Sequence, residues 1–252
     1  MSDRSTGAFA GLGSALDEGS SRAGFLRKGA VGGALLVGGG ALLGRPAVAL
    51  AGHTDNIPDA DVLNYALTLE YLEASFYTQA LGGPGTTGVP SAPAKFNRGA
   101  ITGSRLIAGF GGRIRSTAYG YLLAIRNHEV AHVNFLRAGL GAAAVEAPTF
   151  NFTSALRNVG TFLATARVLE NTGVMAYDGA IRYVDSGDFL QAGAQIATVE
   201  ARHAAYLNLI SRGSPFPTAF DVGKKPSEIF AAAGPFIASA PASVTALFSR
   251  LP

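Results

Sequence analysis

Two short segments of the chain combine a carboxylate with an imidazole at the same spacing. Glu129 precedes His132 by three residues, and Glu200 precedes His203 in the same way. Residues three apart lie on one face of an α-helix, so each pair can direct both side chains at one point. The chain holds eight glutamates and only four histidines, so two such pairs would arise by chance in under about 1% of similar chains. The pairs therefore indicate metal ligands.

A single glutamate within an apolar helical stripe precedes each pair. Glu70 and Glu170 both follow a leucine, and a tyrosine comes seven residues after each of them, Tyr77 and Tyr177. The order of Glu and then Glu-x-x-His thus occurs twice. Four helices that supply four carboxylates and two imidazoles to the core of a bundle make a two-metal site. The predicted ligands are Glu70, Glu129, His132, Glu170, Glu200 and His203.

The charge of this ligand set favours two divalent ions. Four ionised carboxylates in an apolar core would repel one another, and two divalent cations neutralise them. Oxygen-rich ligation with some imidazole suits iron or manganese, whereas structural zinc prefers a closed four-ligand site. The chain has no cysteine, which excludes thiolate sites, iron–sulfur clusters and disulfides. We expect two iron ions, with manganese as the alternative, roughly 3.5–4 Å apart and open to dioxygen or peroxide.

Three further side chains lie close to the predicted ligands along the sequence. Glu73 comes nearly one turn after Glu70, so it either faces the metals or is a solvated or neighbouring carboxylate. Tyr77 and Tyr177 are either core aromatics whose hydroxyls find a partner or side chains that support the metal ligands.

His128 creates an alternative interpretation, because His128 and Glu129 begin the pattern His-Glu-x-x-His of zinc proteases. In that pattern the glutamate is a general base and not a ligand. In the second pair, Val199 precedes Glu200 where His128 precedes Glu129, so the repeated unit begins at the glutamate. We therefore expect His128 to point away from the metals, at an interface or at the surface.

Hydrophobic periodicity predicts four long helices and no convincing strand, so the predicted fold is all-α. The helices are expected over residues 59–81, 113–137, 153–184 and 189–211. The short link between the last two makes them antiparallel neighbours. Gly, Pro, Ser and Thr are frequent over residues 82–112, which predicts a long connection between helices one and two with one short helix. The Pro-rich tail after Gly213 is expected to be irregular, with a short helix near 227–233.

The first 51 residues have the composition of an export signal. Basic residues around Arg27 precede an apolar, Gly-rich run over 29–44, and Ala49-Leu50-Ala51 is a small-x-small cleavage pattern. The run is shorter than the roughly 20 residues of a membrane span. Residues 21–27 resemble a twin-arginine signal in which Ala23 replaces the second arginine. An ordinary secretory signal or an uncleaved anchor is the alternative.

These features predict two segments, an export signal over residues 1–51 and a bundle domain with its tail over 52–252. The protein is then exported, to the periplasm, the cell envelope or the extracellular space. The mature part carries no cluster of Lys and Arg, which excludes a nucleic-acid partner, and no stable membrane span is expected in it. Homo-oligomerisation stays open.

The repeated pairs, the order of the four helices and the paired tyrosines resemble the ferritin-like superfamily. Residues 64–77 and 215–237 further resemble exported ferritin-like domain proteins related to plant desiccation-associated proteins, and the similarity covers residues 57–240. The resemblance implies a ferritin-like four-helix bundle in which Glu70 and Glu170 are terminal or bridging ligands. The two Glu-x-x-His pairs supply the other four.

The resemblance leaves the reaction open, because relatives oxidise and store iron, scavenge peroxide, oxidise substrates or have no known activity. We expect a carboxylate-bridged di-iron centre that performs oxidative chemistry with dioxygen or peroxide. The alternatives are a manganese catalase-like peroxide scavenger and a non-catalytic bundle that protects against stress or desiccation.

Overall fold

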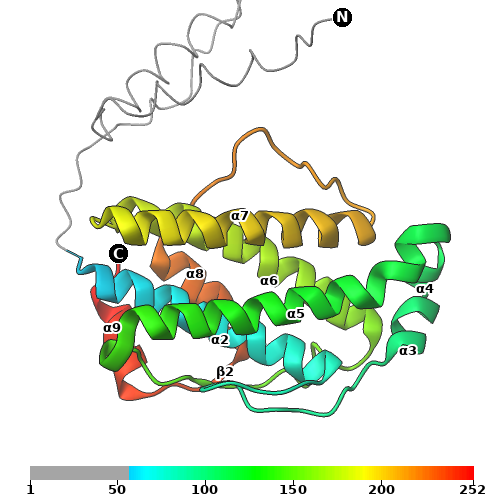
Figure 1. Cartoon of the computed structure of the whole chain (residues 1–252), viewed down its shortest axis with the longest axis horizontal. Helices are drawn as coiled ribbons and strands as arrows, with labels where there is room; N and C mark the ends of the chain where they lie inside the picture. Colours follow the sequence, from blue (N-terminus) through cyan, green and yellow to red (C-terminus); the bar gives the residue numbers. More distant parts are fainter. Residues whose placement is uncertain (1–56) are drawn as a thin grey trace, which may run out of the picture. The chain divides into compact units, whose positions relative to one another are not determined.

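The structure is a computed structural model that describes residues 57–252, and four long helices form its core (Figure 1). The export signal predicted for residues 1–51 lies outside the described residues. The helices match the four apolar periodic segments of the sequence, which confirms the all-α bundle. They are α2 (Asp59–Leu81), α5 (Gly112–Leu140), α6 (Val159–Ala180) and α7 (Gly187–Ile210).

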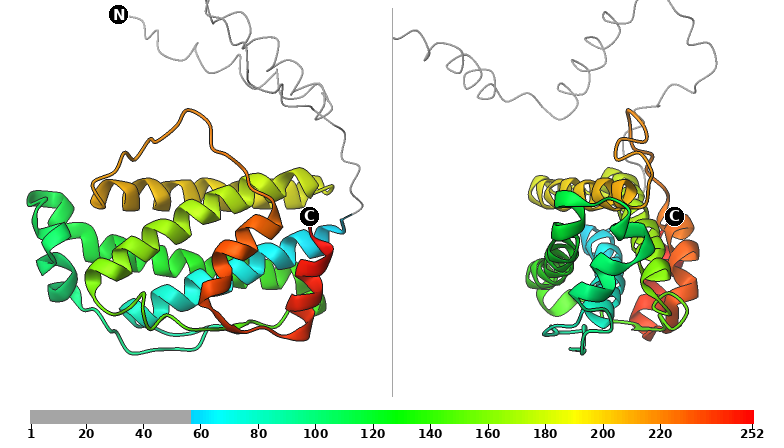
Figure 2. Two further views of the ribbon diagram at one scale, coloured as in Figure 1. Left: turned by 180° about the vertical axis from the view of Figure 1, so that it is seen from behind. Right: turned by 90° about the vertical axis from the view of Figure 1, so that its right-hand side faces the viewer.

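The bundle consists of two helix pairs. Helix α2 packs along α5, and α6 packs along α7, whereas α5 and α7 contact each other little. Within each pair the helices run in opposite directions, and residues 141–158 cross the length of the bundle to connect the pairs (Figure 1). The end-on view in Figure 2 shows the four helices around a common centre. Each pair contains one lone glutamate and one Glu-x-x-His segment, so the pairs are the two copies of the internal repeat.

Large apolar side chains from every long helix fill the centre of the bundle. Phe76 of α2 has its ring centroid 5.3 Å from that of Phe152 and 5.4 Å from that of Phe162 of α6. Leu122 of α5 and Leu207 of α7 are fully buried in the same core. Burial of apolar surface at about 25 cal/mol per Å² is the main force that holds such a bundle together.

The connection between α2 and α5 contains two short helices and not one as predicted. They are α3 (Arg98–Gly103) and α4 (Arg105–Ala108). Gly82 ends α2 with a φ of 72°, and a β-carbon there would lie 2.5 Å from the backbone nitrogen of Ala94. The connection therefore passes so close to the end of α2 that only glycine fits.

The C-terminal tail covers the outer side of α2 and α6 (Figure 2). The predicted short helix is present as α8 (Pro226–Ala233), but the sequence analysis missed α9 (Ala242–Arg250). It also missed a small antiparallel sheet of β1 (Thr149–Phe150) and β2 (Ile237–Ser239), which attaches the tail to the crossover connection. Among the described residues, no helix is both long and apolar enough to span a membrane.

Helix α6 begins at Val159, whereas the sequence analysis placed its start at residue 153 or 154. The side chain of Asn158 accepts a hydrogen bond from the backbone N–H of Thr161 at 2.9 Å, and the Thr161 hydroxyl accepts one from the Asn158 N–H. This capping box satisfies donors that the first turn of a helix leaves free. Residues 153–158 form turns, because the helix starts after its cap, Asn158, and not at the earlier polar residues Thr153 and Ser154.

Replacing Asn158 with alanine removes the cap of the helix that carries Glu170. We expect Asn158→Ala to lower the free energy of unfolding by about 1 kcal/mol, and Asn158→Asp to keep it, because aspartate caps equally well. Urea unfolding followed by circular dichroism measures both. Equal loss in the two variants would contradict a capping role.

Candidate metal centre

The structure brings all six predicted ligands together at the centre of the bundle. Helices α2 and α6 supply one glutamate each, and α5 and α7 each supply a glutamate and a histidine one turn apart. The four carboxylates are fully buried, and the residues His132 and His203 are 9% and 5% exposed. The members are Glu70, Glu129, His132, Glu170, Glu200 and His203.

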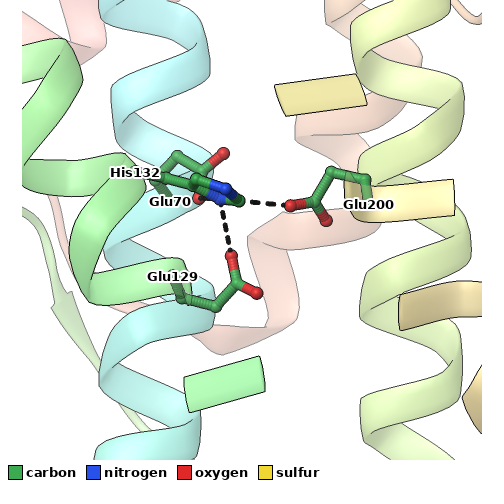
Figure 3. Close-up of side chains that lie close together, drawn as sticks. All are labelled: Glu70, Glu129, His132 and Glu200. Atoms are coloured by element: carbon green, nitrogen blue, oxygen red, sulfur yellow. Dashed lines mark hydrogen bonds and ion pairs between the residues drawn. The ribbon is translucent and has the colours of Figure 1, made fainter. Parts of the chain in front are cut away.

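These side chains form two overlapping groups whose ligand atoms lie within 4.8 Å of one another. Glu70 and His132 belong to the first group only, and Glu170 and His203 to the second group only. Both groups share Glu129 and Glu200. If each group held one ion, Glu129 and Glu200 would be common to both ions, whereas Glu70 and Glu170, which we call the terminal glutamates, would each serve one. Figure 3 shows the first group.

Three carboxylates converge on a single nitrogen in the first group. The Nδ1 atom of His132 lies 3.2 Å from an oxygen of Glu70, 3.2 Å from one of Glu129 and 3.3 Å from one of Glu200 (Figure 3). The single N–H group at Nδ1 cannot donate a good hydrogen bond to all three carboxylate oxygens. The second group repeats the pattern, with Nδ1 of His203 at 3.0 Å from Glu129 and 3.0 Å from Glu170.

This donor set fits two cations. Within residues 57–252, Oε2 of Glu200 is buried without a hydrogen bond or an ion pair. Buried carboxylates are stable only when paired or bound to metal. Four carboxylates match the charge of two divalent ions, and the imidazoles supply nitrogen ligands of the kind that iron and manganese accept.

The two tyrosines hold the terminal glutamates from across the bundle. The hydroxyl of Tyr77 donates to Glu170 at 2.6 Å, and that of Tyr177 donates to Glu70 at 2.6 Å. Burial, followed by the nearby glutamates, raises the pKa of both tyrosines well above the usual value, so both keep the proton that they donate. Each terminal carboxylate therefore has one oxygen fixed and the other directed at a histidine. Hydrogen bonds of this type orient metal ligands.

Burial and mutual repulsion shift the ionisation of the cluster. Burial first, and then neighbouring glutamates, raise the pKa of Glu129, Glu200 and Glu73. Burial also raises the pKa of Glu70, but the adjacent His132 outweighs it and lowers the pKa below its usual value. Burial lowers the pKa of His203, but hydrogen bonds with Glu129 and Glu170 overcome this and raise it to about 11. Without metal, protons therefore supply the positive charge that the carboxylates require.

His128 lies at the surface and outside both groups of ligand atoms, as expected from the sequence, but its contact with His203 was not predicted. His128 is exposed, but its Nδ1 lies 2.9 Å from Nε2 of His203, and the two rings stack with centroids 5.1 Å apart. The raised pKa of His203 keeps both ring nitrogens protonated, so Nδ1–H donates to the carboxylates and Nε2–H donates to Nδ1 of His128, which fixes the orientation of the ring. The contact depends on how α5 packs beside α7, and the only signal in the sequence was that Val199 replaces His128 in the second copy.

The fold and the site define a four-helix bundle with a buried cluster of glutamates and histidines at its centre that could bind metal. In agreement, residues 58–212 match the family described as the ferritin-like domain. The chain belongs to this family. A comparison with curated proteins finds no match.

Removing metal should make the stability of the protein fall as the pH rises. In the folded protein the pKa of Glu73, Glu129 and Glu200 is raised above the usual value of 4.5, and the pKa of His203 is raised above 6.5. The folded state therefore binds these protons more tightly than the unfolded state does. This stabilisation is complete below those usual values and is lost as the pH rises through the folded-state values. The lowered pKa of Glu70 affects stability only at pH values below about 4.5.

We therefore expect the urea midpoint of the metal-free protein to decrease from pH 5 to pH 9. Divalent metal ions should reverse this trend, because ligands lose their protons when they bind metal. Urea unfolding in the presence of a chelator, and then with excess manganese, measures both. A midpoint of the metal-free protein that is constant or rises over this range would contradict the prediction.

His128 should affect metal affinity although it is not one of the six ligands. We expect His128→Leu to weaken the binding of a metal ion at the His203 position by about tenfold, because His203 loses the acceptor that orients it. His128→Gln retains an acceptor and should lose less. Calorimetric titration with cobalt(II) measures both variants. Unchanged affinity in His128→Leu would show that the contact has no orienting role.

Proposed function

We propose that this protein binds two metal ions, in the preferred case iron, between its four long helices and uses them for oxidation by dioxygen or peroxide. One observation supports this most directly. Carboxylates from three helices converge on Nδ1 of His132, and two of them, Glu129 and Glu200, also belong to the group around His203. Hydrogen bonding alone does not require such convergence. Two adjacent ferrous ions held there would supply the electrons that reduce dioxygen or peroxide, with each ion oxidised to the ferric state.

The protein's own side chains would give this chemistry three conditions. Glu129 and Glu200, which belong to both groups of ligand atoms, would hold the ions close together. Tyr77 and Tyr177 hold Glu170 and Glu70 in place. Burial of all four carboxylates would keep bulk water away from the ions.

We also propose that the protein is exported and related to the desiccation-associated branch of ferritin-like proteins. The basic and apolar composition of residues 1–51 and the small-x-small pattern that ends them support export. The zero cysteine count suits an oxidising compartment, because no thiol is at risk there. Oxidation of a metal or consumption of peroxide outside the cytoplasm would suit a protein that responds to stress.

Metal content and oxygen consumption test the proposal. Protein expressed in metal-replete medium should contain about two iron ions per chain, and Glu129→Ala and His203→Ala should lose most of them. Glu146→Ala, which removes an exposed glutamate outside the cluster, is the control and should keep both. On addition of ferrous ion, an oxygen electrode should record uptake that is about 100-fold slower in Glu129→Ala.

The same samples separate the alternatives. Release of oxygen from peroxide by the manganese-loaded protein, with no uptake by the iron-loaded protein, would replace iron oxidation with a catalase-like function. Equal, near-zero iron and manganese in wild type and both ligand variants would refute the metal site and favour a protective bundle without catalysis.

A further inference from the structure

Glu73 is a buried carboxylate outside the six-residue set. It lies one turn after Glu70 on α2 and is 3% exposed. Within residues 57–252, no hydrogen bond or salt bridge to another side chain is formed by its carboxylate. On one side it borders a small cavity of about 30 Å³ with mainly apolar walls, which include Leu72 and Phe236. A carboxylate with these surroundings lacks a compensating positive charge.

The internal repeat shows that this position is specific to one half of the bundle. Glu70 corresponds to Glu170, and Tyr77 to Tyr177, so the residue that corresponds to Glu73 is Gly173. A β-carbon at Gly173 would lie 3.0 Å from Oε2 of Glu200 and 3.4 Å from Oε1 of Glu73. The second copy thus lacks a side chain at the place where the first copy adds a carboxylate. The missing side chain makes room for Glu73 beside Glu200.

The orientation of Glu200 links Glu73 to the cluster. Oε1 of Glu200 lies 3.3 Å from Nδ1 of His132, on the side of the histidines. Oε2 of Glu200 is buried without a hydrogen bond and lies on the side of Gly173 and Glu73. Gly173 lies on α6 one turn after Glu170, so the carboxylate of Glu73 lies beside the helix that carries the terminal glutamate of the His203 group.

We propose that Glu73 is a seventh metal-binding side chain, which ligates the ion in the His203 group and makes that position the tighter of the two. The proposal rests on the two-metal function proposed above. A fifth carboxylate gives the His203 position one more oxygen ligand and one more negative charge than the His132 position has. A further difference between the two copies, His128 in place of Val199, also orients the histidine of this position.

Cobalt(II) titration of the full chain, followed by calorimetry, tests the proposal. Wild type should bind two ions in two steps whose affinities differ by about tenfold or more. Glu73→Gln keeps the shape of the side chain and removes its charge, so it should still bind two ions but with the first step about tenfold weaker. Glu73→Ala is the second variant and should show the same loss. Ser75→Ala, which changes another buried polar residue of α2, is the control and should leave both steps unchanged.

The outcomes separate this inference from the proposed function. Wild-type affinities for both ions in Glu73→Gln and Glu73→Ala would overturn the role of Glu73 and leave the two-metal site standing, provided that Glu129→Ala abolishes binding. Failure of wild type to bind cobalt(II) would overturn both. Gly173→Ala gives an independent check, because its methyl group would press on Glu200 and Glu73 and should weaken the first step as well.

Discussion

The structure depends on the neutralisation of a group of carboxylates that the bundle removes from water. Four glutamates of the cluster are fully buried, and Glu73 is nearly so. Ionised carboxylates are too costly in an apolar core unless a positive charge lies among them. The fold leaves two ways to provide that charge, protons or metal cations. Each of the two groups contains one imidazole at the point where its carboxylates converge. Without metal, protonated His132 and His203 therefore provide the positive charge that the proposed cations would otherwise provide.

The same hydrogen bonds that orient the terminal glutamates also connect the two halves of the bundle. Helices α2 and α6 belong to different copies of the repeat and contact each other less than each contacts its partner in the pair. The bond from Tyr77 to Glu170 runs from α2 to α6, and the bond from Tyr177 to Glu70 runs back. All four groups are buried, so water cannot replace a lost hydrogen-bond partner. Loss of either bond would therefore leave unpaired polar groups in the core. The geometry of the site and the association of the halves therefore depend on the same contacts.

Local patterns predicted what depends on local structure. The spacing of Glu129 and His132 follows from the helical period, and the apolar stripes around Glu70 and Glu170 predicted that these two glutamates are buried. The predicted start of α6 was wrong, because the cap residue Asn158 determines where the helix begins and the apolar pattern does not. Helix α9 and the pairing of β1 with β2 were missed because short elements in the tail form through contacts with distant parts of the chain. The contact of His128 with His203 was missed for the same reason, since it depends on the lateral packing of two helices.

Internal repetition explains why the two halves resemble each other, and its exceptions show where they differ. Exact repetition would give both metal positions equal surroundings, with one terminal glutamate, one histidine and one tyrosine contact each. The differences between the two copies beside the ligands include His128 against Val199 and Glu73 against Gly173. His128 adds a polar group beside His203, and Glu73 adds one beside Gly173, which vacates the volume that Glu73 occupies. An addition matched by a deletion in the facing helix keeps the core filled, so the asymmetry is compatible with the close packing of the bundle.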